Sequence, residues 1–191
     1  MLEAFISAVV FSVLGEIADK TQLIILGLSL KYKAPFKVFL GALAGHAVMD
    51  GIAIIIGYYF GFVFSSNMSI LDEIVGSLFI LFGLWGLLKR YIIKSRKEKE
   101  NKVRHSMPLI ATFLTILVVE IGDKTQIASG LLAAKYLQPI PIILGVIVGL
   151  AITIGLNVFV GRKLAEKLPR NTIRTASYIL FILFGLFTLL F

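Results

Sequence analysis

Six apolar stretches, each about 20 residues or longer, occupy most of this 191-residue sequence. They cover residues 4–30, 36–63, 70–92, 108–134, 139–161 and 172–191. A helix that crosses the roughly 30 Å hydrocarbon core of a bilayer needs about 20 apolar residues. The stretches are continuous rather than alternating, so they predict membrane-spanning helices and not the strands of a barrel. The sequence therefore predicts an all-α membrane protein with six transmembrane helices.

The composition excludes the ordinary soluble classes of protein. Hydrophobic residues make up 58% of the chain and charged residues only 16%, whereas about a quarter of a typical soluble domain is charged. The chain has no cysteine, which excludes disulfides and Cys-ligated metal sites. Its net charge of +8 lies mostly between the apolar stretches, where basic residues contact lipid headgroups and set topology. We therefore expect membrane lipids, and no nucleic acid, among its partners.

The two halves of the chain are copies of one another. Residues 16–22 read E-I-A-D-K-T-Q, and residues 120–126 read E-I-G-D-K-T-Q, at an offset of 104. The same offset relates two G-x-x-x-G pairs, at Gly41 and Gly45 and at Gly145 and Gly149. Because both copies share this pair, we expect it to pack helices closely within one molecule. The sequence divides into a first three-helix repeat (1–92), a charged cytoplasmic linker (93–107) and a second three-helix repeat (108–191).

The distribution of basic residues predicts the orientation of these repeats. Sixteen Lys and Arg residues fall in the loops on one side of the predicted bundle, and only Lys135 falls on the other side. By the positive-inside rule the sixteen face the cytoplasm, so both termini are expected on the non-cytoplasmic side. Since each repeat has three spans, the copies enter the membrane from opposite sides. This predicts an inverted repeat, typical of secondary transporters, in the inner cell membrane.

Each copied motif falls near the middle of its apolar stretch, where a charge is unfavourable. On one continuous helix Glu16, Asp19, Lys20 and Gln22 share a face, and Thr21 points away. The second motif repeats this face with Glu120, Asp123, Lys124 and Gln126. Four carboxylates and two lysines leave a charge of −2, which a divalent cation or two protons would balance. Alternatively, the Glu–Lys pairs four residues apart only neutralise each other and join the helices.

The ligand types narrow the choice of ion. Neither motif contains histidine or cysteine, and carboxylate and amide oxygens suit hard divalent ions such as Ca²⁺, Mg²⁺ and Mn²⁺. Mg²⁺ loses its water reluctantly, so a transport site favours Mn²⁺ or Ca²⁺. The transported ion is expected in place of any tightly bound cofactor, with Lys20 and Lys124 compensating charge. The predicted metal ligands are Glu16, Asp19, Gln22, Glu120, Asp123 and Gln126.

The doubled motif resembles that of a family of small cation/proton antiporters with paired E-x-G-D-(K/R)-(T/S) sequences. That family includes bacterial manganese exporters and Golgi calcium/manganese transporters, and the resemblance covers essentially the whole chain. It implies that Glu16, Asp19, Glu120 and Asp123 bind the ion and that protons are exchanged for it. Together with the proton gradient, it implies export of Mn²⁺ or Ca²⁺ from the cytoplasm. One departure is Ala18, which stands where the family pattern has glycine.

Two other functions fit parts of the sequence. An exporter of small amino compounds would also have six spans and would use a free lysine to bind a carboxylate. An intramembrane hydrolase could use paired aspartates to activate water, but each aspartate here lies beside a lysine, and no nucleophile is evident. We therefore expect a transporter and not an enzyme.

His46 and Asp50 lie four residues apart in the second stretch, and their counterparts in the second repeat are Leu150 and Ile154. The pair is therefore not part of the duplicated site. It could relay a proton, because histidine titrates near neutrality, or it could be a packed hydrogen-bonded pair. The sequence favours packing.

Overall fold

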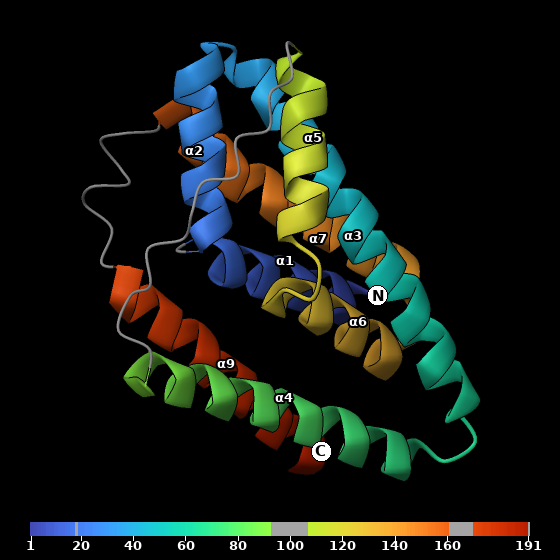
Figure 1. The fold of residues 1–191 in the computed structure, drawn as a ribbon. Coiled ribbons are helices and arrows are strands. Elements are labelled where there is room, and N and C mark those ends of the chain that lie inside the picture. Colours follow the sequence, from blue (N-terminus) through green and yellow to red (C-terminus); the bar gives the residue numbers. More distant parts are fainter. Residues whose placement is uncertain (18, 93–106, 161–169, 191) are drawn as a thin grey trace.

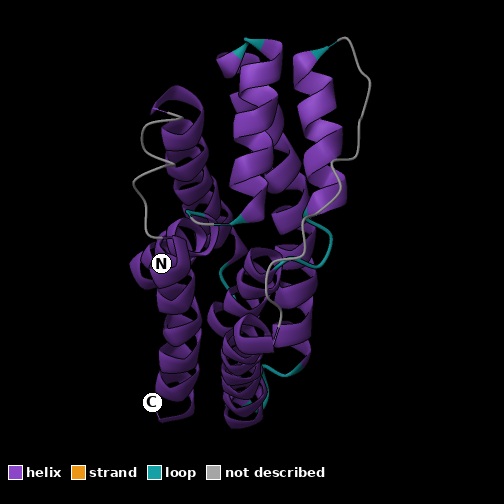
Figure 2. Cartoon of the chain, turned by 60° about the vertical axis from the view of Figure 1, so that its left-hand side comes forward, coloured by secondary structure: helices purple, strands orange, loops and turns teal. Residues whose placement is uncertain are grey.

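The computed structural model describes residues 1–17, 19–92, 107–160 and 170–190, and every element in them is a helix (Figures 1 and 2). This agrees with the predicted all-α class. The side chains of most of the predicted linker 93–107, and of residues 162–174, which include five of the sixteen basic loop residues, lie outside the described part of the structure. The elements are α1 (Leu2–Glu16), α2 (Lys20–Tyr32), α3 (Pro35–Val63), α4 (Met68–Ile92), α5 (Pro108–Val119), α6 (Lys124–Tyr136), α7 (Pro139–Gly155), the π-helix η1 (Leu156–Val160) and α9 (Arg170–Leu190).

Several of these helices have the length and apolar character needed to cross a membrane. Within the described residues the long apolar stretches are Pro35–Val63, Met68–Leu88 and Pro139–Phe159. Pro108–Val119 and Tyr178–Leu190 are apolar but shorter. Large apolar side chains such as Ile56, Phe62 and Trp85 are exposed, while several carboxylates are buried. This is the reverse of the pattern in soluble proteins, and it fits a surface that faces lipid.

The first and fourth apolar stretches are broken, so our prediction of one continuous helix in each is wrong. α1 ends at Glu16 and α2 begins at Lys20, while α5 ends at Val119 and α6 begins at Lys124. At each break an aspartate with extended backbone, Asp19 or Asp123, is the N-cap of the following helix. Aspartate is among the most favoured N-cap residues. At the second break Gly122 also adopts a φ of +71°, which glycine tolerates better than other residues.

The two halves pack reciprocally at their first helices. α1 packs on α7, and α5 packs on α3. A Cβ added at Gly45 would lie 2.8 Å from Ile116 Cβ, and one at Gly145 would lie 2.8 Å from Ala8 Cβ. The two G-x-x-x-G pairs therefore join helices within one molecule, as expected. α4 and α9 run side by side, apart from α2 and α5 (Figure 1).

Candidate functional site

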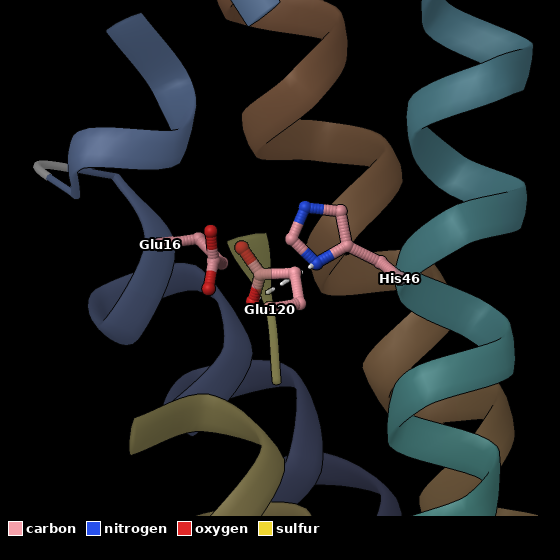
Figure 3. Close-up of side chains that lie close together, drawn as sticks. All are labelled: Glu16, His46 and Glu120. Carbon is pink, nitrogen blue, oxygen red and sulfur yellow. Dashed lines mark ion pairs between the residues drawn. The ribbon is translucent and has the colours of Figure 1, made fainter. Parts of the chain in front are cut away.

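The two helix breaks bring the glutamates of the two motifs together. Glu16 at the end of α1 and Glu120 just after α5 point toward one another and toward His46 of α3 (Figure 3). One carboxylate oxygen from each glutamate and one imidazole nitrogen all lie within 4.8 Å of one another. All three side chains are buried, with exposures of 0%, 2% and 0% for Glu16, Glu120 and His46. We call these three residues the Glu–His cluster; its ligand atoms lie close enough together to hold one metal ion.

The threonine of each motif hydrogen-bonds the glutamate of the other motif. Thr21 Oγ1 donates to Glu120 Oε1 at 2.6 Å, and Thr125 Oγ1 donates to Glu16 Oε1 at 2.7 Å. The prediction that Thr21 points away from the site is therefore wrong. It assumed a continuous helix, whereas the break at Asp19 starts a new helix with a different rotation. The recurrence of threonine in both motifs was the signal that could have placed it.

The aspartates have two different sets of contacts. Asp19 is buried and accepts a hydrogen bond from Lys124 Nζ at 2.6 Å. Asp123 instead caps its own helix: its carboxylate accepts from the backbone N–H of Thr125 at 3.4 Å. Lys124 thus pairs with the aspartate of the opposite motif, rather than with the glutamate four residues before it. The side chain of Lys20 lies outside the described part of the structure.

The glutamines of the two motifs are also not equivalent. Gln22 Nε2 lies 3.4 Å from Glu16 Oε2, and its side-chain oxygen is buried with no hydrogen bond from any described residue. Gln126 Oε1 accepts from the backbone N–H of Gly122 at 2.7 Å, and its Nε2 donates to the carbonyl of Met49 at 3.2 Å. The amide of Gln126 therefore stabilises the break between α5 and α6, whereas the oxygen of Gln22 is available to a ligand.

Asp50 and His46 make different contacts. Its Oδ1 accepts a hydrogen bond from Ser129 Oγ of α6 at 2.7 Å, and it lines a small cavity with Ser12 and Thr125. His46 Nδ1 instead lies 3.7 Å from Glu120 Oε2. The sequence offers two roles for His46, a proton relay or a packed residue, and neither includes its approach to the glutamates. Nothing in the duplication could have placed it, because its counterpart is Leu150.

The arrangement is suited to binding a cation. Buried carboxylates from both motifs gather beside a single described ammonium group, that of Lys124. Helices with exposed apolar surface surround them. Ionisable groups buried within membrane-spanning helices mark ion pathways and binding sites.

Comparisons with known proteins agree with this chemistry. The family model described as "Divalent cation/proton antiporter GDT1" matches residues 4–93 and 108–191. The chain is 31% identical over 183 residues to a Vibrio cholerae protein named "Putative manganese exporter", covering 93% of this chain and 86% of that protein. It is 25% identical over 224 residues to "GDT1-like protein 5" of Arabidopsis thaliana, covering 100% and 96%. No solved structure matches the chain.

The family match extends over both repeats and leaves out only residues 1–3 and 94–107, the latter almost the whole predicted linker. It assigns the chain to transporters and not to enzymes. The substrates of this family, a divalent cation and protons, are those expected to bind at a buried carboxylate site. By its sequence and its doubled motif, the chain belongs to the GDT1 family of divalent cation/proton antiporters.

Proposed function

We propose that this protein exports Mn²⁺, Ca²⁺ or both from the cytoplasm in exchange for protons. The observation that carries the proposal is the convergence of Glu16 and Glu120 at the two helix breaks. Two buried carboxylates whose oxygens lie within 4.8 Å of one another repel when both are ionised, and a dication relieves that repulsion. Protonation of the carboxylates relieves the same repulsion. Competition between one dication and protons for the same oxygens is the basis of an exchange mechanism.

The remaining predicted ligands bind the ion at other stages of the transport cycle. Asp19 leaves Lys124, and Asp123 leaves the N-cap of α6, so that each can contribute an oxygen. Gln22 offers its buried amide oxygen directly. Gln126 would first have to release the backbone N–H of Gly122. Lys124, and with it Lys20, compensates the negative charge of the site when the ion has left.

The proposed topology is two inverted three-helix repeats with both termini on the non-cytoplasmic side of the inner cell membrane. Reciprocal packing of α1 on α7 and of α5 on α3 supports this arrangement, since an internal two-fold axis would produce it. The crosswise hydrogen bonds from Thr21 and Thr125 support the same axis. Sites at broken helices between inverted repeats are a recurring feature of secondary transporters.

The direction of transport rests on the proton gradient and on the relatives. A proton gradient directed into the cell would drive the dication outward through an antiporter. The name of the Vibrio cholerae relative supports manganese as the exported ion.

Purified protein in liposomes would test the proposal. With an imposed pH gradient, Mn²⁺ entering the vesicles quenches an enclosed indicator, while a pH-sensitive dye records proton movement in the opposite direction. Glu16→Gln and Glu120→Gln should each abolish both signals. Glu73→Gln, the same substitution at an exposed position on α4, is the matched control and should transport normally. Wild-type transport by both buried variants would show that the site is elsewhere.

A further inference from the structure

We propose that His46 is the nitrogen ligand of the transported ion and that it makes the site prefer a transition-metal dication over Ca²⁺. This inference rests on the proposed function and deepens it by naming a residue that determines selectivity. It starts from the Glu–His cluster, in which the imidazole comes from α3 and the two carboxylates come from the helix breaks (Figure 3).

Close packing of α3 on α5 places the imidazole. Gly45 lets the backbone of α3 approach Ile116, which lies four residues, about one turn, before Glu120. His46 follows Gly45 directly, and its Nδ1 lies 3.7 Å from Glu120 Oε2. This separation is too long for a hydrogen bond. It is compatible with two ligand atoms that bind the same ion from different sides.

The imidazole is buried without a hydrogen bond. His46 is 0% exposed, and neither ring nitrogen has a hydrogen-bond partner among the described residues. Buried polar groups in proteins nearly always have a partner, so an exception requires an explanation. A cation shared with Glu16 and Glu120 supplies one for one of the two nitrogens, because a neutral imidazole offers one nitrogen lone pair and keeps one N–H.

The second repeat does not supply a second nitrogen. Leu150 is the counterpart of His46, so the two glutamates, one from each repeat, are joined by a single imidazole. Ca²⁺ takes oxygen ligands, whereas imidazole suits the later transition metals such as Fe, Ni, Cu and Zn, and Mn²⁺ is at the weak end of that series. Affinity for such sites rises from Mn²⁺ to Fe²⁺ and Co²⁺. The nitrogen therefore favours Mn²⁺ and the later metals over Ca²⁺.

A relay from His46 to Asp50 is the competing role. Asp50 lies one turn further along α3, but its carboxylate oxygen is hydrogen-bonded to Ser129 of α6. No hydrogen bond joins the imidazole to Asp50 among the described residues. A relay or packing residue would not bond to the metal, so spectroscopy of the bound ion distinguishes these roles.

Pulsed electron paramagnetic resonance of Mn²⁺ bound to the purified protein provides the test. A directly bonded imidazole adds nitrogen modulation to the Mn²⁺ signal, and labelling of histidine with ¹⁵N changes its frequency. We expect this modulation in the wild type and its loss in His46→Asn, which places an amide oxygen close to the position of Nδ1. His105→Asn is the matched control, since it removes the other histidine of the chain.

Calorimetry on the same proteins measures selectivity. His46→Asn should lower Mn²⁺ affinity at least about tenfold, as loss of even an outer-shell partner often does, while Ca²⁺ affinity stays close to wild type. Bound Mn²⁺ without nitrogen modulation in the wild type would overturn the role of His46 but leave the carboxylate site intact. Equal loss of affinity for both ions in His46→Asn would also overturn it, in favour of a structural role. A wild type that binds no Mn²⁺ would overturn the proposed manganese site as well.

Discussion

Replacing Gly45 by alanine tests whether close contact between the repeats stabilises the protein. The added methyl carbon would lie 2.8 Å from Ile116 Cβ, 2.9 Å from Ile116 Cγ2 and 3.2 Å from the carbonyl oxygen of Phe113. None of these atoms belongs to the free end of a flexible side chain. Ile116 is fully buried, so it has little room to turn away. Relief therefore requires α3 and α5 to separate by at least 0.6 Å, the difference between 2.8 Å and the 3.4 Å of ordinary contact.

A second glycine of the same helix separates this clash from the other effects of alanine. At Gly51 an added Cβ would have no heavy atom within 4 Å. Both substitutions gain about 1 kcal/mol of helix propensity, and this gain cancels when the two variants are compared. The difference between them is the cost of overpacking, about 1–3 kcal/mol. For a chain of this length that corresponds to roughly 2–12 °C in the midpoint of thermal unfolding.

The assay is thermal unfolding of the wild type, Gly45→Ala and Gly51→Ala in the same detergent at one scan rate. Gly51→Ala should equal or exceed the wild type, and Gly45→Ala should unfold at the lowest temperature. Manganese uptake into liposomes should fall in Gly45→Ala, because separation of α3 from α5 moves His46 away from Glu120. If the Gly45 variant were as stable as the Gly51 variant, the packing argument would be refuted.

Two further substitutions test the contacts between the motifs. Thr125→Val removes the hydroxyl that donates to the glutamate of the opposite motif and should lower the free energy of unfolding by about 1–3 kcal/mol. The control is Thr115→Val, whose hydroxyl bonds to a carbonyl of its own helix and whose loss should cost less. Equal losses of the two variants in thermal unfolding would contradict this. Lys124→Met should lower the free energy of unfolding by about 3 kcal/mol, because its aspartate partner is buried. Lys135→Met should lower it by at most about 1 kcal/mol, because the partner of Lys135 is 31% exposed. The reverse order of unfolding temperatures would be inconsistent with the ion-pair geometry.

The sequence alone predicts the helical class and the meeting of Glu16 with Glu120, but not how they meet or which other residues join them. The copied motifs predicted that Glu16 and Glu120 belong to one site, and the shared G-x-x-x-G pairs predicted packing within the molecule. The sequence did not predict the helix breaks, because neither motif contains proline and the surrounding residues are mostly apolar. Asp19 followed three residues later by Gln22 is a signal for the start of a helix, and the prediction of one continuous polar face overlooks it.

Contacts between elements distant in the sequence could not be predicted for a different reason. Lys124 pairs with Asp19 because α6 is placed against the first helix break. From the sequence alone, only the pairing with Glu120 four residues earlier could be predicted. Likewise, the approach of His46 to Glu120 depends on the depth to which α3 packs on α5. Such distances are set by tertiary packing, and a single sequence contains no direct record of them.

Reciprocal packing also determines when the protein can complete its structure during synthesis. An added Cβ at Gly145 of α7 would contact the backbone of Phe5 in α1, and Gly145 follows Phe5 by 140 residues. At about 5–20 residues per second, the ribosome needs about 7–28 s to make the intervening chain. During that time α1 lacks its helix partner, and Glu16 lacks the hydroxyl of Thr125. The first half of the chain therefore stays incompletely packed in or near the membrane until the second half is made, and neither half can assemble the site alone.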